Sequence, residues 1–144
     1  MKHHRRTDER GSATIETVIV VPVAVLFLSL AILGGRLAIA QQAVQAAAAD
    51  AARTASIART HTIAQSKGQA AGQASLANQG LTCGQQSVLV DTSQFSRPVG
   101  TPAAVTATVS CDVPASDLGI PGVRAAYPIR ATATSPVDTY RQRA

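Results

Sequence analysis

The longest apolar stretch of the chain covers residues 17–35, which include no charged side chain and are rich in Val, Leu and Ile. As a helix rising 1.5 Å per residue, this stretch matches the hydrocarbon core of a bilayer, which is about 30 Å thick. Pro22 removes one backbone donor within it, a loss that neighbouring helices or local adjustments make tolerable in a membrane. The pattern predicts a transmembrane helix over residues 12–36, preceded by a basic leader, residues 1–11.

The segment after the apolar stretch is rich in Ala, Gln and Arg and contains no proline, which predicts one continuous helix over residues 36–79. Small or apolar residues recur along it every three or four positions, a spacing that places them on one helical face. They are Leu37, Ala40, Val44, Ala48, Ala51, Ala55 and Ala58. Such a stripe allows close packing against a partner helix or the chain's own C-terminal domain. The alternative is a solvated alanine-rich spacer.

Two glycines interrupt this predicted helix. Gly68 and Gly72 each weaken a helix by about 1 kcal/mol relative to alanine, so we expect fraying or a bend from Lys67 onward. Their four-residue spacing lies in a polar setting and gives only weak support for helix dimerisation.

The last part of the chain, residues 80–144, changes to alternating, β-branched segments separated by turn residues. Three strands are expected, at residues 87–91, 103–113 and 127–137. Proline- and glycine-rich connections at residues 97–102 and 114–122 separate them. The expected fold class is α+β, with a long N-terminal transmembrane and extracytoplasmic helix (12–36 and 37–79) and a small antiparallel β-rich domain (80–144).

Composition and charge narrow the class of protein. The chain is 46% hydrophobic but only 3% aromatic, so the part outside the membrane can build only a thinly packed core. Its net charge of +5 is scattered and lacks stacking aromatics, which argues against nucleic-acid binding.

The placement of the basic residues predicts a topology. Lys2, Arg5, Arg6 and Arg10 precede the apolar stretch, and only Arg36 lies in the first turns after it. Because Lys and Arg favour the cytoplasmic flank, we expect the N-terminus in the cytoplasm and the C-terminal part outside the cell membrane.

A cleavable secretory signal is the competing interpretation of the apolar stretch. Ala38 and Ala40 precede Gln41 in an A-x-A arrangement that signal peptidase accepts. The apolar core of a signal is usually about 7 to 15 residues, whereas this one is longer and is followed by Arg36. A permanent anchor is therefore favoured over cleavage after Ala40, and either reading exports the C-terminal part.

Cys83 and Cys111 are the only cysteines, and both fall in the part expected outside. An exported pair predicts a disulfide, which would stabilise the domain by about 3 to 4 kcal/mol on the chain-entropy model. A structural zinc site needs four ligands, and the histidines His3, His4 and His61 do not supply them. We expect no metal and no cofactor.

Nothing in the sequence indicates an enzyme. It contains no GxSxG, GxxxxGK[ST] or GxGxxG motif, and the exported acids are dispersed without paired spacing. His61 lies in an alanine-rich helical context, where a solvated histidine is the ordinary interpretation.

The start of the apolar helix carries the most specific pattern. Gly11 closes the basic leader, and Glu16 stands five residues later, directly before the uncharged stretch. An isolated carboxylate there is explained by the headgroup zone and the positive end of the helix dipole. Together with the leader, however, the pattern resembles the type IV prepilin signal, which a prepilin peptidase cuts after the glycine. The resemblance implies a cut between Gly11 and Ser12 and pairing of Glu16 with the new N-terminal amine of a neighbouring subunit.

The resemblance extends along "RGSATIE", Pro22, "GGR" at residues 34–36 and "AAAADAARTAS", which look like the TadE-like family of the tight-adherence pilus system. One departure is Thr17, where that family often has Phe or Tyr. The resemblance implies a pilin-like, single-pass protein of the bacterial cell envelope. It would act as a minor pseudopilin or assembly component, with the membrane, a prepilin peptidase and other pilus subunits as partners. The alternative is an anchored or secreted surface binding domain unrelated to pili.

Overall fold

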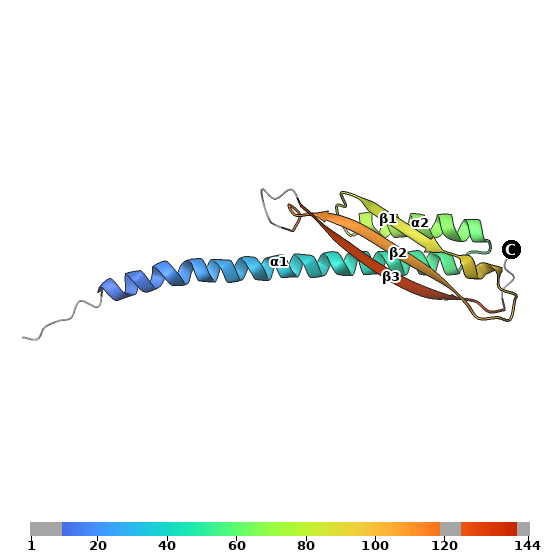
Figure 1. The fold of residues 1–144 in the computed structure, drawn as a ribbon, viewed down its shortest axis with the longest axis horizontal. Coiled ribbons are helices and arrows are strands. Elements are labelled where there is room, and N and C mark those ends of the chain that lie inside the picture. The colour runs from blue at the N-terminus through green and yellow to red at the C-terminus, as the bar shows by residue number, and fades with distance from the viewer. Residues whose placement is uncertain (1–9, 119–124, 141–144) are drawn as a thin grey trace, which may run out of the picture. The chain divides into compact units, whose positions relative to one another are not determined.

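The computed structural model describes residues 10–118 and 125–140, with side chains from residue 17 onward. In chain order its elements are α1 (Arg10–Ser56), α2 (His61–Asn78), β1 (Gln86–Asp91), the 3₁₀ helix η1 (Ser93–Ser96), β2 (Ala103–Pro114) and β3 (Ala126–Val137) (Figure 1). The chain forms two units, Met1–Gly35 and Arg36–Ala144. The expected α+β class is confirmed: a long N-terminal apolar helix is followed by a small antiparallel sheet.

The first unit is the N-terminal part of α1. All described side chains over residues 17–32 are exposed, including Val18, Leu26 and Phe27 at 68%, 59% and 69%. Pro22 lies inside the helix without ending it. The Ser29 hydroxyl donates to the Val25 carbonyl at 2.8 Å, so its polar group is satisfied within the helix. Among the described residues, this is the one helix long and apolar enough to cross a membrane.

The second unit begins with the C-terminal half of α1, which does not continue as the sequence predicted. The expectation of one continuous helix over residues 36–79 is wrong, because α1 ends at Ser56 and α2 begins at His61. The two helices run antiparallel: Gly68 lies beside Ala55, whereas the later residue Gln79 donates to the earlier Ala43 carbonyl at 3.2 Å.

Side-chain hydroxyls explain the break. The Ser56 hydroxyl donates to the Arg53 carbonyl at 2.8 Å, and such bonds compete with the helical ladder. Thr60 adopts an extended backbone (φ −124°, ψ 153°), and its hydroxyl oxygen accepts from the Ile63 amide at 3.3 Å. Threonine is a favoured N-cap, so the segment ends one helix and starts another without glycine or proline.

Gly68 and Gly72 lie where α2 packs on α1 and β1. A Cβ at Gly68 would stand 3.0 Å from the Ala55 Cβ and 3.1 Å from the Ala51 carbonyl oxygen; at Gly72 it would stand 2.9 Å from a Val88 methyl. The glycines therefore allow close contact within the chain. The helix continues unbroken through both, so the expected fraying is wrong.

The stripe of small residues on α1 is buried, as expected for packing against the chain's own C-terminal domain. Its most buried members are at most 2% exposed: Ala40, Val44, Ala48, Ala51 and Ala55. The neighbouring Ala43, Ala47 and Ala52, which the prediction did not include, are at most 3% exposed. Ala58 is 8% exposed and Leu37 is partly exposed. The alternative of a solvated spacer is wrong for this face.

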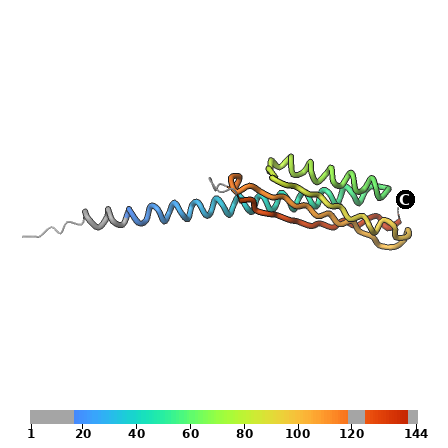
Figure 2. The backbone as a smooth tube through the Cα atoms, turned by 45° about the horizontal axis from the view of Figure 1, so that its top comes forward, coloured from blue at the N-terminus to red at the C-terminus, as the bar shows by residue number. Residues whose placement is uncertain are grey.

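The sheet has the strand order β1-β2-β3, with both pairs antiparallel. Its strands match the three expected segments to within one residue at each end. One face is buried by alternate residues, which include Val88, Val90, Val105, Val109, Val113 and Ile129. Within the second unit the helices form one layer and the sheet forms the other (Figures 1 and 2).

The opposite face of the sheet carries paired threonines. Thr106 faces Thr134 and Thr108 faces Thr132, with hydroxyl oxygens 3.1 Å apart in each pair. Cross-strand hydroxyl pairs of this kind add modest stability to a face that remains polar. The domain is consequently two layers deep, with one apolar interior between the helices and the sheet.

Candidate functional site

The expected processing residues Gly11, Ser12 and Glu16 fall in the first two turns of α1, which begins at Arg10. Their side chains lie outside those that the structure describes. The cut between Gly11 and Ser12 and the pairing of Glu16 therefore stay predictions.

The two cysteines lie at disulfide distance, with sulfur atoms 2.01 Å and Cα atoms 5.3 Å apart. Cys111 is fully buried on β2, and Cys83 belongs to the connection from α2 to β1. That connection is also held by the backbone, because the Gly84 amide donates to the Asp112 carbonyl at 2.8 Å. The pairing joins the segment that precedes β1 to β2, the central strand of the sheet.

A cleft of about 480 Å³ opens beside the first residues of the second unit. We call it the Arg36 cleft. Its lining is contributed by three segments: Arg36, Ile39 and Ala40 of α1; Gln79, Gly80, Leu81 and Thr82 after α2; and Val113, Ser116, Asp117 and Leu118 at the end of β2. Segments far apart in the sequence therefore meet in one concave surface.

The Arg36 guanidinium joins two of these segments by a hydrogen bond. It donates to the Asp117 backbone carbonyl at 3.2 Å, across 81 positions of sequence. The Asp117 amide in turn donates to the Pro114 carbonyl at 3.0 Å, which fixes the turn after β2. The Asp117 carboxylate accepts from the Ser116 hydroxyl at 3.5 Å.

From the sequence, Arg36 serves only as a marker of topology, and no pattern there predicts this cleft. The spacing of Arg36 and Asp117 carries no local signal, because the contact depends on how the sheet folds back onto α1. The one hint in the sequence was the turn-forming segment at residues 114–118, which contains a proline, two small residues and one acid, Asp117.

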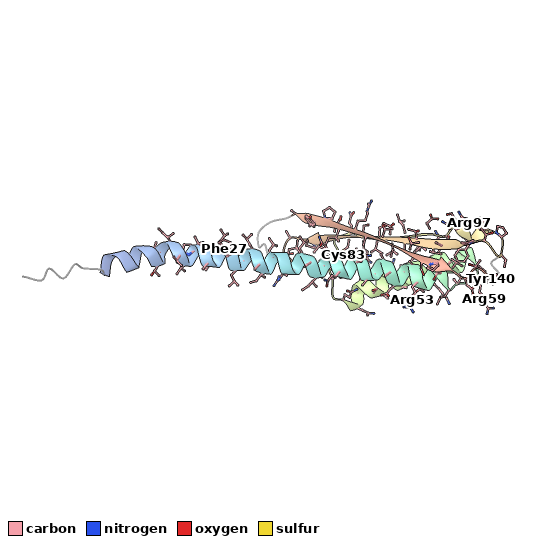
Figure 3. All side chains as sticks on the ribbon, turned by 90° about the horizontal axis from the view of Figure 1, so that it is seen from below. Phe27, Arg53, Arg59, Cys83, Arg97 and Tyr140 are labelled. Atoms are coloured by element: carbon pink, nitrogen blue, oxygen red, sulfur yellow. A yellow bond between two sulfur atoms is a disulfide. The ribbon has the colours of Figure 1, made fainter. Side chains whose placement is uncertain are left out.

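A second concavity of about 590 Å³ lies between the end of α1 and the end of β3, lined by Ser56, Ile57 and residues 136–140. The Ser135 hydroxyl donates to the Ser56 hydroxyl at 3.0 Å beside it. Figure 3 shows Tyr140, Arg59 and Arg97 at this end of the unit, away from Cys83.

No group of three or more His, Cys, Asp or Glu side chains within the described residues is arranged to hold a metal. Backbone and hydroxyl hydrogen bonds from Ser93 lower the pKa of the Asp91 carboxyl below its ordinary value of 3.8. Since the Ser93 amide donates to Asp91 at 2.9 Å across two residues, this is a local turn.

Comparison with known proteins finds a match to part of α1. The family model described as TadE-like protein matches residues 11–53. The resemblance found in the sequence is thereby confirmed over this segment, which covers the apolar stretch and most of the buried small-residue stripe. No curated protein and no solved structure matches the chain.

Proposed function

From the TadE-like segment at residues 11–53, we propose that this chain is a membrane-anchored component of a tight-adherence pilus system, acting as a minor pseudopilin or assembly factor. The observation that carries the proposal is the position of the match. It covers the apolar part of α1, whose side chains are exposed, and most of the buried small-residue stripe that packs in the second unit. The single helix α1 would thus provide both the anchor and the surface on which the exported domain folds.

The proposed topology has the N-terminus in the cytoplasm and the second unit outside the cell membrane. The basic leader supports this orientation through the bias of Lys and Arg toward the cytoplasmic flank. The cysteine pair at disulfide distance also supports it, because disulfides persist in oxidising compartments. The role is structural, consistent with a family of pilus-associated components and not of enzymes.

Anchoring is supported over signal cleavage by the position of Ala40. This residue is 2% exposed and packs in the second unit, and α1 runs through it without interruption. A cut after Ala40 would remove this residue and Arg36 from the folded unit and delete the Asp117 hydrogen bond. A surface-binding domain produced by this cut would therefore lack part of the core of the second unit.

The proposed processing follows the same family. A prepilin peptidase would cut between Gly11 and Ser12, and the carboxylate of Glu16 would then meet the new amine of a neighbouring subunit. In a membrane the pairing of a charge with a countercharge offsets its cost of desolvation. The partners are thus the peptidase, the membrane and other pilus subunits.

The deciding experiment is N-terminal sequencing by mass spectrometry of the protein from its native membrane. Ser12 is the result expected of a processed pseudopilin, and Met1 or Lys2 would indicate a plain anchor. Finding Gln41 would refute the pilus interpretation.

The role of Glu16 is tested by Glu16→Ala, with Glu9→Ala as the matched control because Glu9 lies in the leader that the cut would remove. Glu16→Ala should leave membrane insertion intact and reduce pilus assembly, while Glu9→Ala should assemble normally. Normal assembly of Glu16→Ala would remove the proposed role of this carboxylate.

A further inference from the structure

The Arg36 cleft begins where the apolar stretch ends. Arg36 is the first residue after residues 17–35, and Ile39 follows it by about 4.5 Å along the helix axis. In an anchored chain the residues directly after a membrane span lie among lipid headgroups. Arg36, which lines the cleft, would therefore lie at headgroup level.

The polar groups of the cleft carry both signs of charge. Arg36 contributes a guanidinium with five N–H donors, of which one serves the Asp117 carbonyl oxygen. Asp117 contributes a carboxylate, which accepts a long 3.5 Å hydrogen bond from the Ser116 hydroxyl. Both residues are exposed, so a cation and an anion face solvent beside each other.

Apolar side chains border these charges. Ile39 is 67% exposed, Leu81 is partly exposed, and both line the cleft together with the buried Leu118. A ligand suited to this surface carries an anionic group for Arg36, a cationic group for Asp117 and an apolar portion. Purely anionic ligands meet repulsion from the carboxylate.

We propose that the Arg36 cleft binds the headgroup of a zwitterionic phospholipid that has a primary ammonium group. The lipid phosphate accepts from the Arg36 guanidinium, the ammonium donates to the Asp117 carboxylate, and the glycerol region rests on Ile39 and Leu81. The inference depends on the proposed membrane anchorage. It assigns to the cleft a lipid ligand that fixes the second unit on the membrane surface.

The choice among lipids follows from hydrogen bonding. A quaternary ammonium, as in phosphatidylcholine, offers no N–H donor to Asp117, whereas phosphatidylethanolamine offers three. Phosphatidylglycerol has no cation at all. Because hydrogen bonds to charged groups are stronger than those between neutral groups, the expected preference for phosphatidylethanolamine is on the order of tenfold.

The test uses the full chain in nanodiscs containing equal amounts of these three lipids. Native mass spectrometry then measures which lipids stay bound after release from the disc. The wild-type protein should retain phosphatidylethanolamine on the order of tenfold over each of the other two lipids. Asp117→Asn keeps the backbone carbonyl that accepts from Arg36, so the fold contact is preserved while the preference over phosphatidylcholine should be lost.

Arg36→Gln should abolish retention of all three lipids. The matched control is Arg97→Gln, because the Arg97 guanidinium also donates to a backbone carbonyl, that of Pro102 at 2.9 Å, but lies away from the cleft. The control should retain lipid as the wild type does.

Equal retention of the three lipids by the wild type would overturn the proposal, as would an unchanged preference in Asp117→Asn or a stronger preference for phosphatidylglycerol. These outcomes leave the membrane anchorage standing. A chain that fails to enter nanodiscs would instead overturn the anchorage, and the lipid proposal with it.

Discussion

The substitution Gly68→Ala tests how closely the two helices of the second unit approach each other. On an exposed helix, replacing glycine by alanine stabilises by about 1 kcal/mol, because glycine loses more backbone entropy on folding. At this position the added methyl meets the Ala55 Cβ at 3.0 Å, the Ala51 carbonyl oxygen at 3.1 Å and a Val90 methyl at 3.1 Å. Three neighbours on two elements would have to move together.

The two effects oppose each other, and the contact distances decide the sign. Overpacking a filled core costs about 1 to 3 kcal/mol, and a backbone oxygen and a short alanine cannot swing aside. The upper part of that range, about 2 to 3 kcal/mol, therefore applies. After subtracting the gain of about 1 kcal/mol in helix propensity, we expect Gly68→Ala to lower the free energy of unfolding by about 1 to 2 kcal/mol.

The assay is urea unfolding of the full chain in detergent micelles, followed by circular dichroism. Ala70→Gly is the control, since Ala70 is exposed on the same helix and reports propensity alone. It should destabilise by about 1 kcal/mol. If Gly68→Ala instead stabilises by about the amount that Ala70→Gly destabilises, the close contact of α2 with α1 is refuted.

Two further predictions concern stability. Cys83→Ser should lower the free energy of unfolding by about 3 to 4 kcal/mol, because it opens a loop with a separation of 28 residues; reductant should do the same to the wild type, and an unchanged urea midpoint would contradict it. The Ser93 amide lowers the folded-state pKa of the Asp91 carboxyl below 3.8. The contribution of Asp91 to the free energy of unfolding is therefore fully present above pH 3.8 and is lost as the pH falls through the folded-state pKa. The stability difference between wild type and Asp91→Ala should therefore shrink on acidification from about pH 5 to pH 2, and a constant difference would count against this turn.

Local patterns predicted much of the fold. Alternation of apolar and polar residues located all three strands to within one residue, since a sheet with one covered face repeats every two positions. The stripe on α1 was predicted by its spacing of three and four. Both signals are intrinsic to a single element and need no knowledge of its neighbours.

The predictions that were wrong or missing concern the places where helices and strands contact one another. The break between Ser56 and His61 depends on side-chain hydroxyls that form hydrogen bonds with the backbone. In a segment rich in alanine, a strong helix former, these hydroxyls are only a weak sequence signal. Helix propensity alone predicts that Gly68 and Gly72 weaken the helix. In the structure they face α1 and β1 so closely that a Cβ would crowd its neighbours, so the packing requires glycine there. The contact of Arg36 with Asp117 is set by tertiary folding alone, so sequence reasoning missed the cleft.

The direction of β3 has a mechanical consequence. This strand starts near the turn held by Arg36 and ends near Ser56, where Ser135 contacts that residue. Tension applied between Arg36 and Tyr140 would act along the strand, so β3 would have to slide past β2 in shear. All twelve register pairs between the two strands would bear that load at once, instead of parting one by one as in a zipper.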